Sequence, residues 1–213
     1  MTITHHPDDD VLAAYAAGTL DDGSAFVIAA HLAMCGACRS AVRDFECIGG
    51  VLLGETEPSR LGRAHDGAVM QELAAPQELR RKLAVTTAPD TAVDNLISIF
   101  GQSSWKWRGF GVHSADIGVP VDNGMRVFLL KAAAGTRMPQ HTHSGVELTL
   151  VLKGAFQHEF GRFEPGDIEM ADGDIDHRPI VDAGSECVCL VAMNGRLQLH
   201  GLVGRLLQPF VRI

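Results

Sequence analysis

The sequence predicts an α + β protein of two domains, a small helical domain followed by an antiparallel β-barrel. Residues 8–53 read as three short helices separated by glycines. From Leu96 onward the pattern changes to short β-branched and aromatic runs bounded by Gly, Pro or Asp, such as MRVFLLKA and ELTLVLKG. A series of such strands is typical of an antiparallel barrel or jelly roll.

The composition is that of a globular protein and argues against a nucleic-acid binder. Of the 213 residues, 46% are hydrophobic and 21% are charged, and the net charge is −8. Residues 1–85 carry twelve acidic and seven basic side chains, whereas a phosphate-binding surface would be basic. An acidic helical domain would suit a basic protein partner. No stretch reaches the ~18 apolar residues of a membrane span, and the acidic start lacks an export signal. We therefore expect neither a membrane span nor export.

The cysteines indicate metal or redox chemistry. There are five, an odd number, and two of them form the Cys-x-x-Cys of Cys35 and Cys38. In a chain without a recognisable export signal, this pattern favours reduced thiols over structural disulfides. We therefore expect a cytoplasmic protein.

Each predicted helix has its own start and stop signals. Residues 8–17, DDDVLAAYAA, open with acidic side chains that suit the helix dipole, and Gly18 is a natural stop. A second helix should start within 21–24 and run through AFVIAAHLAM, and a third should run from about 38 to 53. The third helix has an apolar face made of Val42, Phe45, Ile48, Leu52 and Leu53.

The junction of the second and third helices carries a zinc-binding pattern. His31 and Cys35 are four residues apart, about one helical turn, and Cys38 completes the Cys-x-x-Cys that holds tetrahedral zinc. A fourth ligand must come from elsewhere, and His5 and His6 both lie just before the first helix. A redox Cys-x-x-Cys is the rival interpretation, but it would follow a strand, and here a helix precedes it.

This His-x3-Cys-x2-Cys with an upstream His resembles the zinc-binding anti-sigma domains. The resemblance implies a structural zinc ion held by His6, His31, Cys35 and Cys38. Residues 66–85 predict a further helix, or two with a break at Pro76, and Leu73, Leu79 and Leu83 form an apolar stripe. This stripe is either part of the core or, as the resemblance implies for the last helix, a surface that packs on a sigma factor. We expect this domain to span 1–85, a linker to span 86–95, and the β domain to span 96–213.

A second metal motif lies in GTRMPQHTHSGVELTLVLKG, residues 135–154. His141 and His143 are two apart, so on an extended chain both side chains leave the same face. A turn at 144–145 can bring Glu147 to the same point, and His177 is the best further candidate. Imidazole and carboxylate donors together suit Zn, Fe, Mn, Ni or Cu.

The same stretch resembles the first motif of the cupin superfamily, since Gly135, His141, His143, Glu147 and Gly154 occupy its fixed positions. The second cupin motif is weaker. Gly166-Asp167 and His177 fit its spacing, but other residues stand where Pro, Gly and Asn are expected: Asp172, Asp174 and Val181. The resemblance implies an antiparallel cupin β-barrel with zinc or another divalent transition metal held by His141, His143, Glu147 and His177.

Several reactive side chains lie outside these motifs. Cys187 and Cys189 would share one face of a strand, either as small buried apolar residues or as a redox-sensitive pair or soft metal ligands. The histidines without ligand spacing are treated as ordinary ones: His65, His113, His158 and His200. Core or edge packing is expected for Cys47, Trp105, Trp107 and Phe110.

Taken in order, the two halves resemble the ChrR type of anti-sigma factors. The resemblance implies a cytoplasmic, non-enzymatic regulator that binds and inhibits an extracytoplasmic-function sigma factor. It also implies release under oxidative stress, by singlet oxygen or organic hydroperoxide, sensed through the cupin domain. No direct contact with nucleic acid or membrane is expected, and a homodimer through the cupin domain stays open. The alternative is a metal-dependent cupin enzyme, a dioxygenase or isomerase, with an N-terminal structural zinc module.

Overall fold

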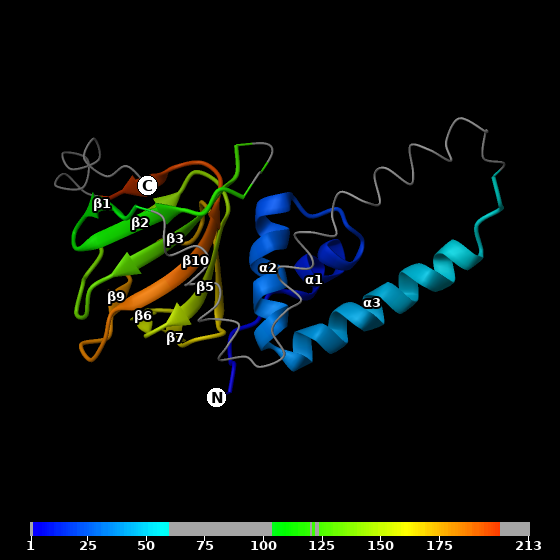
Figure 1. Ribbon diagram of the computed structural model, residues 1–213, viewed down its shortest axis with the longest axis horizontal. Helices are drawn as coiled ribbons and strands as arrows, with labels where there is room; N and C mark the ends of the chain where they lie inside the picture. The colour runs from blue at the N-terminus through cyan, green and yellow to red at the C-terminus, as the bar shows by residue number, and fades with distance from the viewer. Residues whose placement is uncertain (1, 60–103, 120, 122–123, 201–213) are drawn as a thin grey trace.

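The computed structural model describes residues 2–59, 104–119, 121 and 124–200. It consists of a helical module packed beside a β-sheet domain (Figure 1). The helix predicted within 66–85, the linker at 86–95 and the boundaries between the two domains lie outside the described residues. So does His65.

The three predicted helices are present as α1 (Asp9–Ala16), α2 (Asp22–Met34) and α3 (Gly36–Gly54). Asp21 caps α2 because its side chain accepts a hydrogen bond from the Ser24 amide at 2.9 Å. Gly18, with a φ of 67°, follows α1 as a stop. α3 begins earlier than predicted, because the single extended residue Cys35 ends α2 and α3 starts directly after it.

Every strand pairing in the described β domain is antiparallel, as predicted. A six-stranded sheet has the order β1-β2-β3-β10-β5-β8. Its strands are β1 (Lys106–Gly109), β2 (Val112–Asp116), β3 (Arg126–Ala132), β10 (Cys187–Met193), β5 (Glu147–Lys153) and β8 (Ile168–Ala171). Two smaller sheets complete the domain, β11 (Leu197–Leu199) with β4 (His141–His143), and β7 (Gly161–Phe163), β6 (Phe156–His158) and β9 (Ile180–Val181) in the order β7-β6-β9.

The two faces of the central sheet pack against different partners. Leu190 and Ala192 of β10 belong to a core shared with Ile28 and other residues of the helices. Cys189 and Val191 of the same strand belong to the core inside the barrel. Since successive side chains of a strand alternate between faces, β10 is buried along its whole length. The sheet therefore carries the helical module on one face and the barrel interior on the other (Figure 1).

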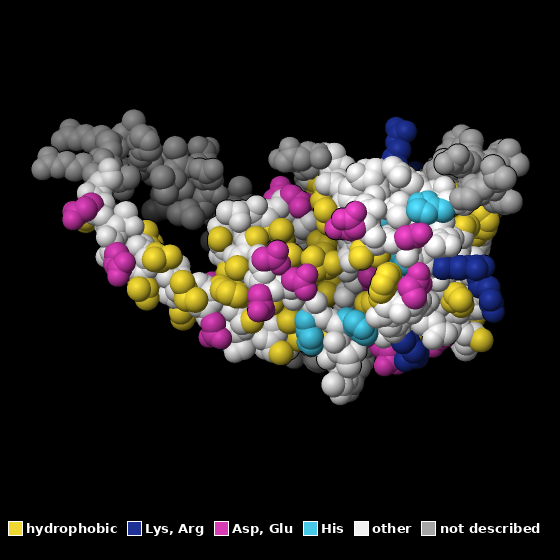
Figure 2. Space-filling view, turned by 180° about the vertical axis from the view of Figure 1, so that it is seen from behind, with side chains coloured by type: hydrophobic (Ala, Val, Ile, Leu, Met, Phe, Trp, Pro, Cys, Tyr) yellow, Lys and Arg dark blue, Asp and Glu magenta, His cyan; other side chains and the backbone are white. Residues whose placement is uncertain are grey.

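α3 projects from the body of the protein (Figure 1). Its first turns are packed through Val42, but Ile48, Val51, Leu52 and Leu53 are 57–74% exposed. Apolar side chains are visible along this arm in Figure 2. The predicted apolar face thus exists, and within the described residues its far half is uncovered. Among the described helices none is alone long and apolar enough to cross a membrane, and α2 and α3 meet that test only as a pair bent by 120°.

The aromatic residues at the start of the β domain lie at its edge. Trp107 belongs to the edge strand β1 and is 66% exposed. The ring of Trp105 lies beneath the Lys131 ammonium, with Nζ 4.5 Å from the ring centroid. Trp107 and Phe110 are exposed at this edge, whereas Trp105 is half-buried and packs against the core shared with the helices. The packing predicted for Cys47 is wrong, because its side chain is exposed on α3.

Candidate metal centres

The first cluster joins the start of the chain to the α2–α3 junction. His31 is in the last turn of α2 and Cys38 in the first turn of α3, so the break at Cys35 turns their side chains toward one another. His31 Nε2 lies 3.2 Å from Cys38 Sγ. His6 Nδ1 lies 3.5 Å from Cys35 Sγ and 3.3 Å from Cys38 Sγ. All four donor atoms lie within 4.8 Å of one another.

These four side chains fit a zinc ion. Around tetrahedral zinc, with Zn–N near 2.05 Å and Zn–S near 2.3 Å, nitrogen and sulfur ligands stand about 3.5 Å apart. The measured separations of 3.2–3.5 Å match that value closely. Burial lowers the pKa of His31 to about 4, so its imidazole is neutral and has a lone pair to offer. Burial and the neighbouring Cys35 raise the pKa of Cys38 to about 12, so a bound metal would have to displace a thiol proton.

The structure also separates the two neighbouring histidines at the start of the chain. His6 points into the cluster. His5 faces the β domain instead, with its Nδ1 3.4 Å from Asp167 Oδ2 and its ring against Phe163. From spacing alone, either histidine could be the fourth ligand, whereas the fold places His6, and not His5, beside the thiols.

The second cluster lies inside the barrel and is formed by His141 and His143 of β4 and His177, which precedes β9. All three side chains are almost fully buried. The His177 Nε2 atom lies 3.0 Å from His141 Nε2 and 3.3 Å from His143 Nε2. His177 stays in place although its turn departs from the cupin pattern, because its backbone exchanges two 3.1 Å hydrogen bonds with His141.

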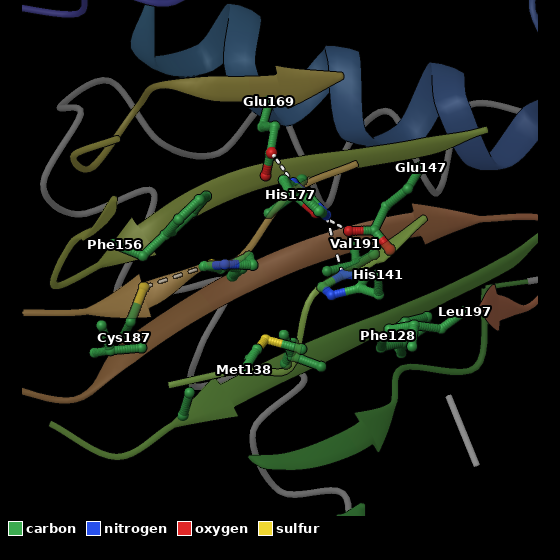
Figure 3. A pocket seen from close by; sticks show the side chains of 16 residues that line it. Phe128, Met138, His141, Glu147, Phe156, Glu169, His177, Cys187, Val191 and Leu197 are labelled. Carbon is green, nitrogen blue, oxygen red and sulfur yellow. Dashed lines mark hydrogen bonds and ion pairs between the residues drawn. The ribbon is translucent and has the colours of Figure 1, made fainter. Parts of the chain in front are cut away.

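Glu147 lies beside this cluster rather than within it. From the start of β5 its Oε2 reaches 3.4 Å from His143 Nδ1, and its Oε1 accepts a 2.9 Å hydrogen bond from Thr149. Figure 3 shows its carboxylate directed toward His177 and His141. It is not among the donors that lie within 4.8 Å of one another. Its assignment as a metal ligand stays a prediction.

Polar partners orient the cluster from outside. His141 Nδ1 donates to the Pro139 carbonyl at 2.8 Å, and His177 Nδ1 lies 2.7 Å from Glu169 Oε1, a pair drawn in Figure 3. Each contact leaves the Nε2 lone pair directed inward, as metal-binding histidines require. Glu169 Oε1 is also 2.7 Å from His158 Nε2. Burial would raise the pKa of Glu169, but its hydrogen bonds from His158 and His177 outweigh that and lower it to about 2.

Sequence reasoning missed both Glu169 and His158. His158 has no ligand spacing, and Glu169 reaches His177 only through folding. The available signals are weak: a carboxylate inside the short apolar segment IEMA, and a histidine two residues after Phe156 that shares its inward face.

The three imidazoles fit a metal but do not select one. With metal–nitrogen distances near 2.05 Å, two nitrogens stand about 3.3 Å apart in a tetrahedron and about 2.9 Å apart in an octahedron. The measured 3.0 and 3.3 Å match either geometry. Burial lowers the pKa of His141 to about 3, so this donor is neutral.

A cavity of about 60 Å³ opens beside the histidines. A volume of this kind holds a few water molecules. Its wall includes Cys187, labelled in Figure 3, and Cys189. Their sulfur atoms are 3.6 Å apart, as the predicted shared face requires. The hydrogen bond with Cys187 and burial raise the pKa of Cys189, so it is a thiol at neutral pH.

The fold joins a helical module that carries a His/Cys cluster to a cupin-like barrel that carries a histidine cluster. Residues 9–39 match the family model "Putative zinc-finger", and residues 95–196 match the model of the ChrR cupin-like domain. The chain is 37% identical to the anti-sigma-E factor ChrR of Cereibacter sphaeroides over 217 aligned residues, which cover all of both chains.

One solved structure gives the same result. The ChrR chain in the crystal structure of Rhodobacter sphaeroides SigE in complex with the anti-sigma ChrR is 37% identical. The match covers 91% of this chain and all of that one, with a TM-score of 0.71. An RmlC-like cupin from Ralstonia eutropha is 20% identical and matches 48% of this chain and 70% of its own, with a TM-score of 0.42. The chain belongs to the ChrR family of anti-sigma factors, and it is a regulator rather than a cupin enzyme.

Proposed function

We propose that this protein binds and inhibits an extracytoplasmic-function sigma factor in the cytoplasm, where RNA polymerase acts. We propose further that it releases the sigma factor under oxidative stress sensed through the cupin domain. The proposal is supported by identity along the whole chain to a relative named as an anti-sigma factor. The similar solved chain is bound to SigE.

The observation in this molecule that carries the proposal is the apolar face of α3, whose far half is uncovered within residues 2–59, 104–119, 121 and 124–200. Phe45, Ile48 and Leu52 follow the 3- and 4-residue spacing of one helix face. Phe45 is half-buried, whereas Ile48 and Leu52 are 57% and 61% exposed. An apolar stripe on a projecting helix marks a protein interaction site. Inserted between the parts of a sigma factor that meet core polymerase and promoter DNA, such a helix would block both by steric exclusion.

Zinc has a structural role in this proposal. Ligation by His6, His31, Cys35 and Cys38 would fix the segment before α1 to the junction from which α3 leaves at 120° to α2. A closed four-ligand site contributes folding energy and leaves no position for catalysis. The metal would thus set the direction of the α3 arm.

The cupin site is the proposed sensor, with zinc or another divalent transition metal held by His141, His143, Glu147 and His177. Cys187 and Cys189 give an oxidant a second target in the same cavity. An organic hydroperoxide would oxidise one thiol to a sulfenic acid, releasing the alcohol. The second thiol would then displace water to form a disulfide. Either change would alter packing on β10, the strand that carries the helices on its other face.

The test begins with purification of the tagged full chain from its native cells and mass spectrometry of co-eluting proteins. We expect a near-stoichiometric sigma factor, which the chain then inhibits in run-off transcription with purified polymerase. Singlet oxygen or an organic hydroperoxide should restore transcription, and the Cys187→Ser, Cys189→Ser variant should bind normally but respond less. Absence of a sigma factor with and without oxidant would sink the inhibitory function, and unrestored transcription would sink the sensing.

A further inference from the structure

The turn that leads into β8 is bound to the first residues of the chain. The backbone amides of Thr4 and His5 donate to Asp167 Oδ1 at 2.7 and 3.0 Å. The Ile168 amide donates to the His5 carbonyl at 3.2 Å. The β domain therefore fixes the backbone directly before His6, the residue that reaches the thiols.

Gly166, the residue before Asp167, contacts the helical module at a second point. Its carbonyl accepts a 2.9 Å hydrogen bond from His31 Nδ1, which leaves His31 Nε2 directed at Cys38. A Cβ at Gly166 would lie 2.7 Å from Ile3 and 3.4 Å from Met34 Cε, and its φ is +92°. Only glycine suits this conformation and this close approach.

The Asp167 carboxylate is well suited to hold this contact. Its side chain is 1% exposed and also accepts from the Glu164 amide at 2.9 Å. Burial would raise the pKa of Asp167, but the hydrogen bonds from Glu164, His5 and Thr4 outweigh burial and lower it. A buried charge with several amide donors is a strong, directional contact.

Two residues further along β8, Glu169 holds His177 Nδ1 in the cupin cluster. The four-residue segment 166–169, here the interdomain strap, thus contacts the outer side of both metal clusters. From the strap one cluster lies toward the helices and the other inside the barrel.

We propose that the interdomain strap supplies positioning residues to both metal sites, so that occupancy of the cupin site strengthens metal binding at the N-terminal site. Gly166 and Asp167 position His31 and His6, and Glu169 positions His177. The inference rests on the ligand sets proposed above. By this coupling, a change at the cupin site reaches the base of α3 through the strap. Because coupling between sites is reciprocal, occupancy of the N-terminal site strengthens metal binding at the cupin site by the same factor.

The test uses the full chain in a Cys187→Ser, Cys189→Ser background loaded with Co²⁺. Thiolate-to-cobalt absorption then reports the N-terminal site, where Cys35 and Cys38 are the clustered thiols. In competition with zinc and a chelator, Asp167→Ala should weaken this site about 10–100-fold, as loss of an outer contact does. Asp116→Asn, an exposed acid paired with Lys106, is the control and should leave it unchanged.

The coupling itself is tested with His177→Ala, which disables the cupin site. We expect it to weaken cobalt binding at the N-terminal site about fivefold or more, and to have little effect once Asp167→Ala is present. If Asp167→Ala does not fold, Asp167→Asn keeps the side-chain volume and takes its place, with a smaller loss expected. Two results would overturn the inference. One is that the Asp167 variant binds cobalt at the N-terminal site as tightly as the Asp116→Asn control. The other is that His177→Ala weakens cobalt binding equally with and without the Asp167 substitution. No sigma factor enters the assay, so its outcome is separate from that of the proposed function.

Discussion

One carboxylate, Glu169, sets the orientation of His177 within the cupin cluster. We expect Glu169→Gln to weaken metal binding at the cupin site about 10–100-fold, because the neutral amide holds His177 Nδ1–H less firmly. Chelator competition on the full chain measures the affinity. Glu186→Gln, which removes an exposed partner of Lys153, is the matched control. Equal affinities in the two variants would show that Glu169 does not position the ligand.

Protons should compete with metal more strongly at the N-terminal site than at the cupin site. The pKa of Cys38 is raised to about 12 by burial and Cys35, so metal displaces its proton at any pH below that, and affinity drops about tenfold per pH unit for each thiol proton. Burial lowers the pKa of His141 to about 3, so it binds no competing proton near neutrality. His177 acts in the opposite direction at the cupin site: burial would lower its pKa, but the hydrogen bond to Glu169 outweighs burial and raises the pKa of His177.

On acidification from about pH 7 to about pH 5, the cobalt–thiolate absorption of the N-terminal site should therefore disappear before the cupin metal is released. Metal analysis after gel filtration at each pH gives the cupin occupancy. Loss of both metals in parallel would contradict this order.

The clustered residues could be predicted from spacing because they are close in sequence. His31, Cys35 and Cys38 lie within eight residues, and His141 and His143 share one face of a strand. Glu169, His158 and the Gly166 carbonyl reach the clusters only through β-strand pairing and domain packing, which leave no local spacing to read. The choice of His6 over His5 likewise depends on Asp167, more than 160 residues away.

Among the elements that the structure describes, α3 has the largest group of exposed apolar side chains, Ile48, Val51, Leu52 and Leu53. We expect Leu52→Asp to weaken sigma-factor binding about tenfold or more, because it places a charge in the apolar stripe that the partner would bury. The free energy of unfolding of the free chain should change by no more than about 0.5 kcal/mol, since the residue is exposed.

Isothermal titration calorimetry and denaturant unfolding measure the two quantities. Glu46→Gln, an exposed residue on the same helix, should leave both unchanged. Binding of Leu52→Asp as tight as that of Glu46→Gln would remove α3 from the interface.

Element types followed from sequence better than element boundaries did. The three helices and the antiparallel strands are where periodicity, Asp21 and Gly18 predict them. The third helix starts at Gly36 rather than near Cys38, because one extended residue suffices to reverse the chain at Cys35. The short strands β4, β6 and β9 carry two or three residues each, too few for a periodic signal.

For the molecule as a whole, the division into two domains predicted from sequence describes the chain order but not the core. Ile28 of α2, Leu150 of β5 and Leu190 of β10 belong to one cluster of buried side chains. The segment ECVCLVAM shows that a strand is buried, but not that helices cover one of its faces. A helical module this small has little core of its own, and its buried side chains belong to a cluster that includes residues of the sheet.

Because the core is shared, the helices and the barrel should unfold in one transition. The two tryptophans, Trp105 and Trp107, report on the β domain by fluorescence, and helical circular dichroism reports on the module. Ile28→Ala truncates a fully buried side chain, so we expect it to lower the free energy of unfolding by about 2–5 kcal/mol, by the same amount with either probe. Leu53→Ala, at a position 74% exposed, should leave this free energy unchanged. If Ile28→Ala lowered the stability of the helices alone, the helical module would be a domain that unfolds independently of the β domain.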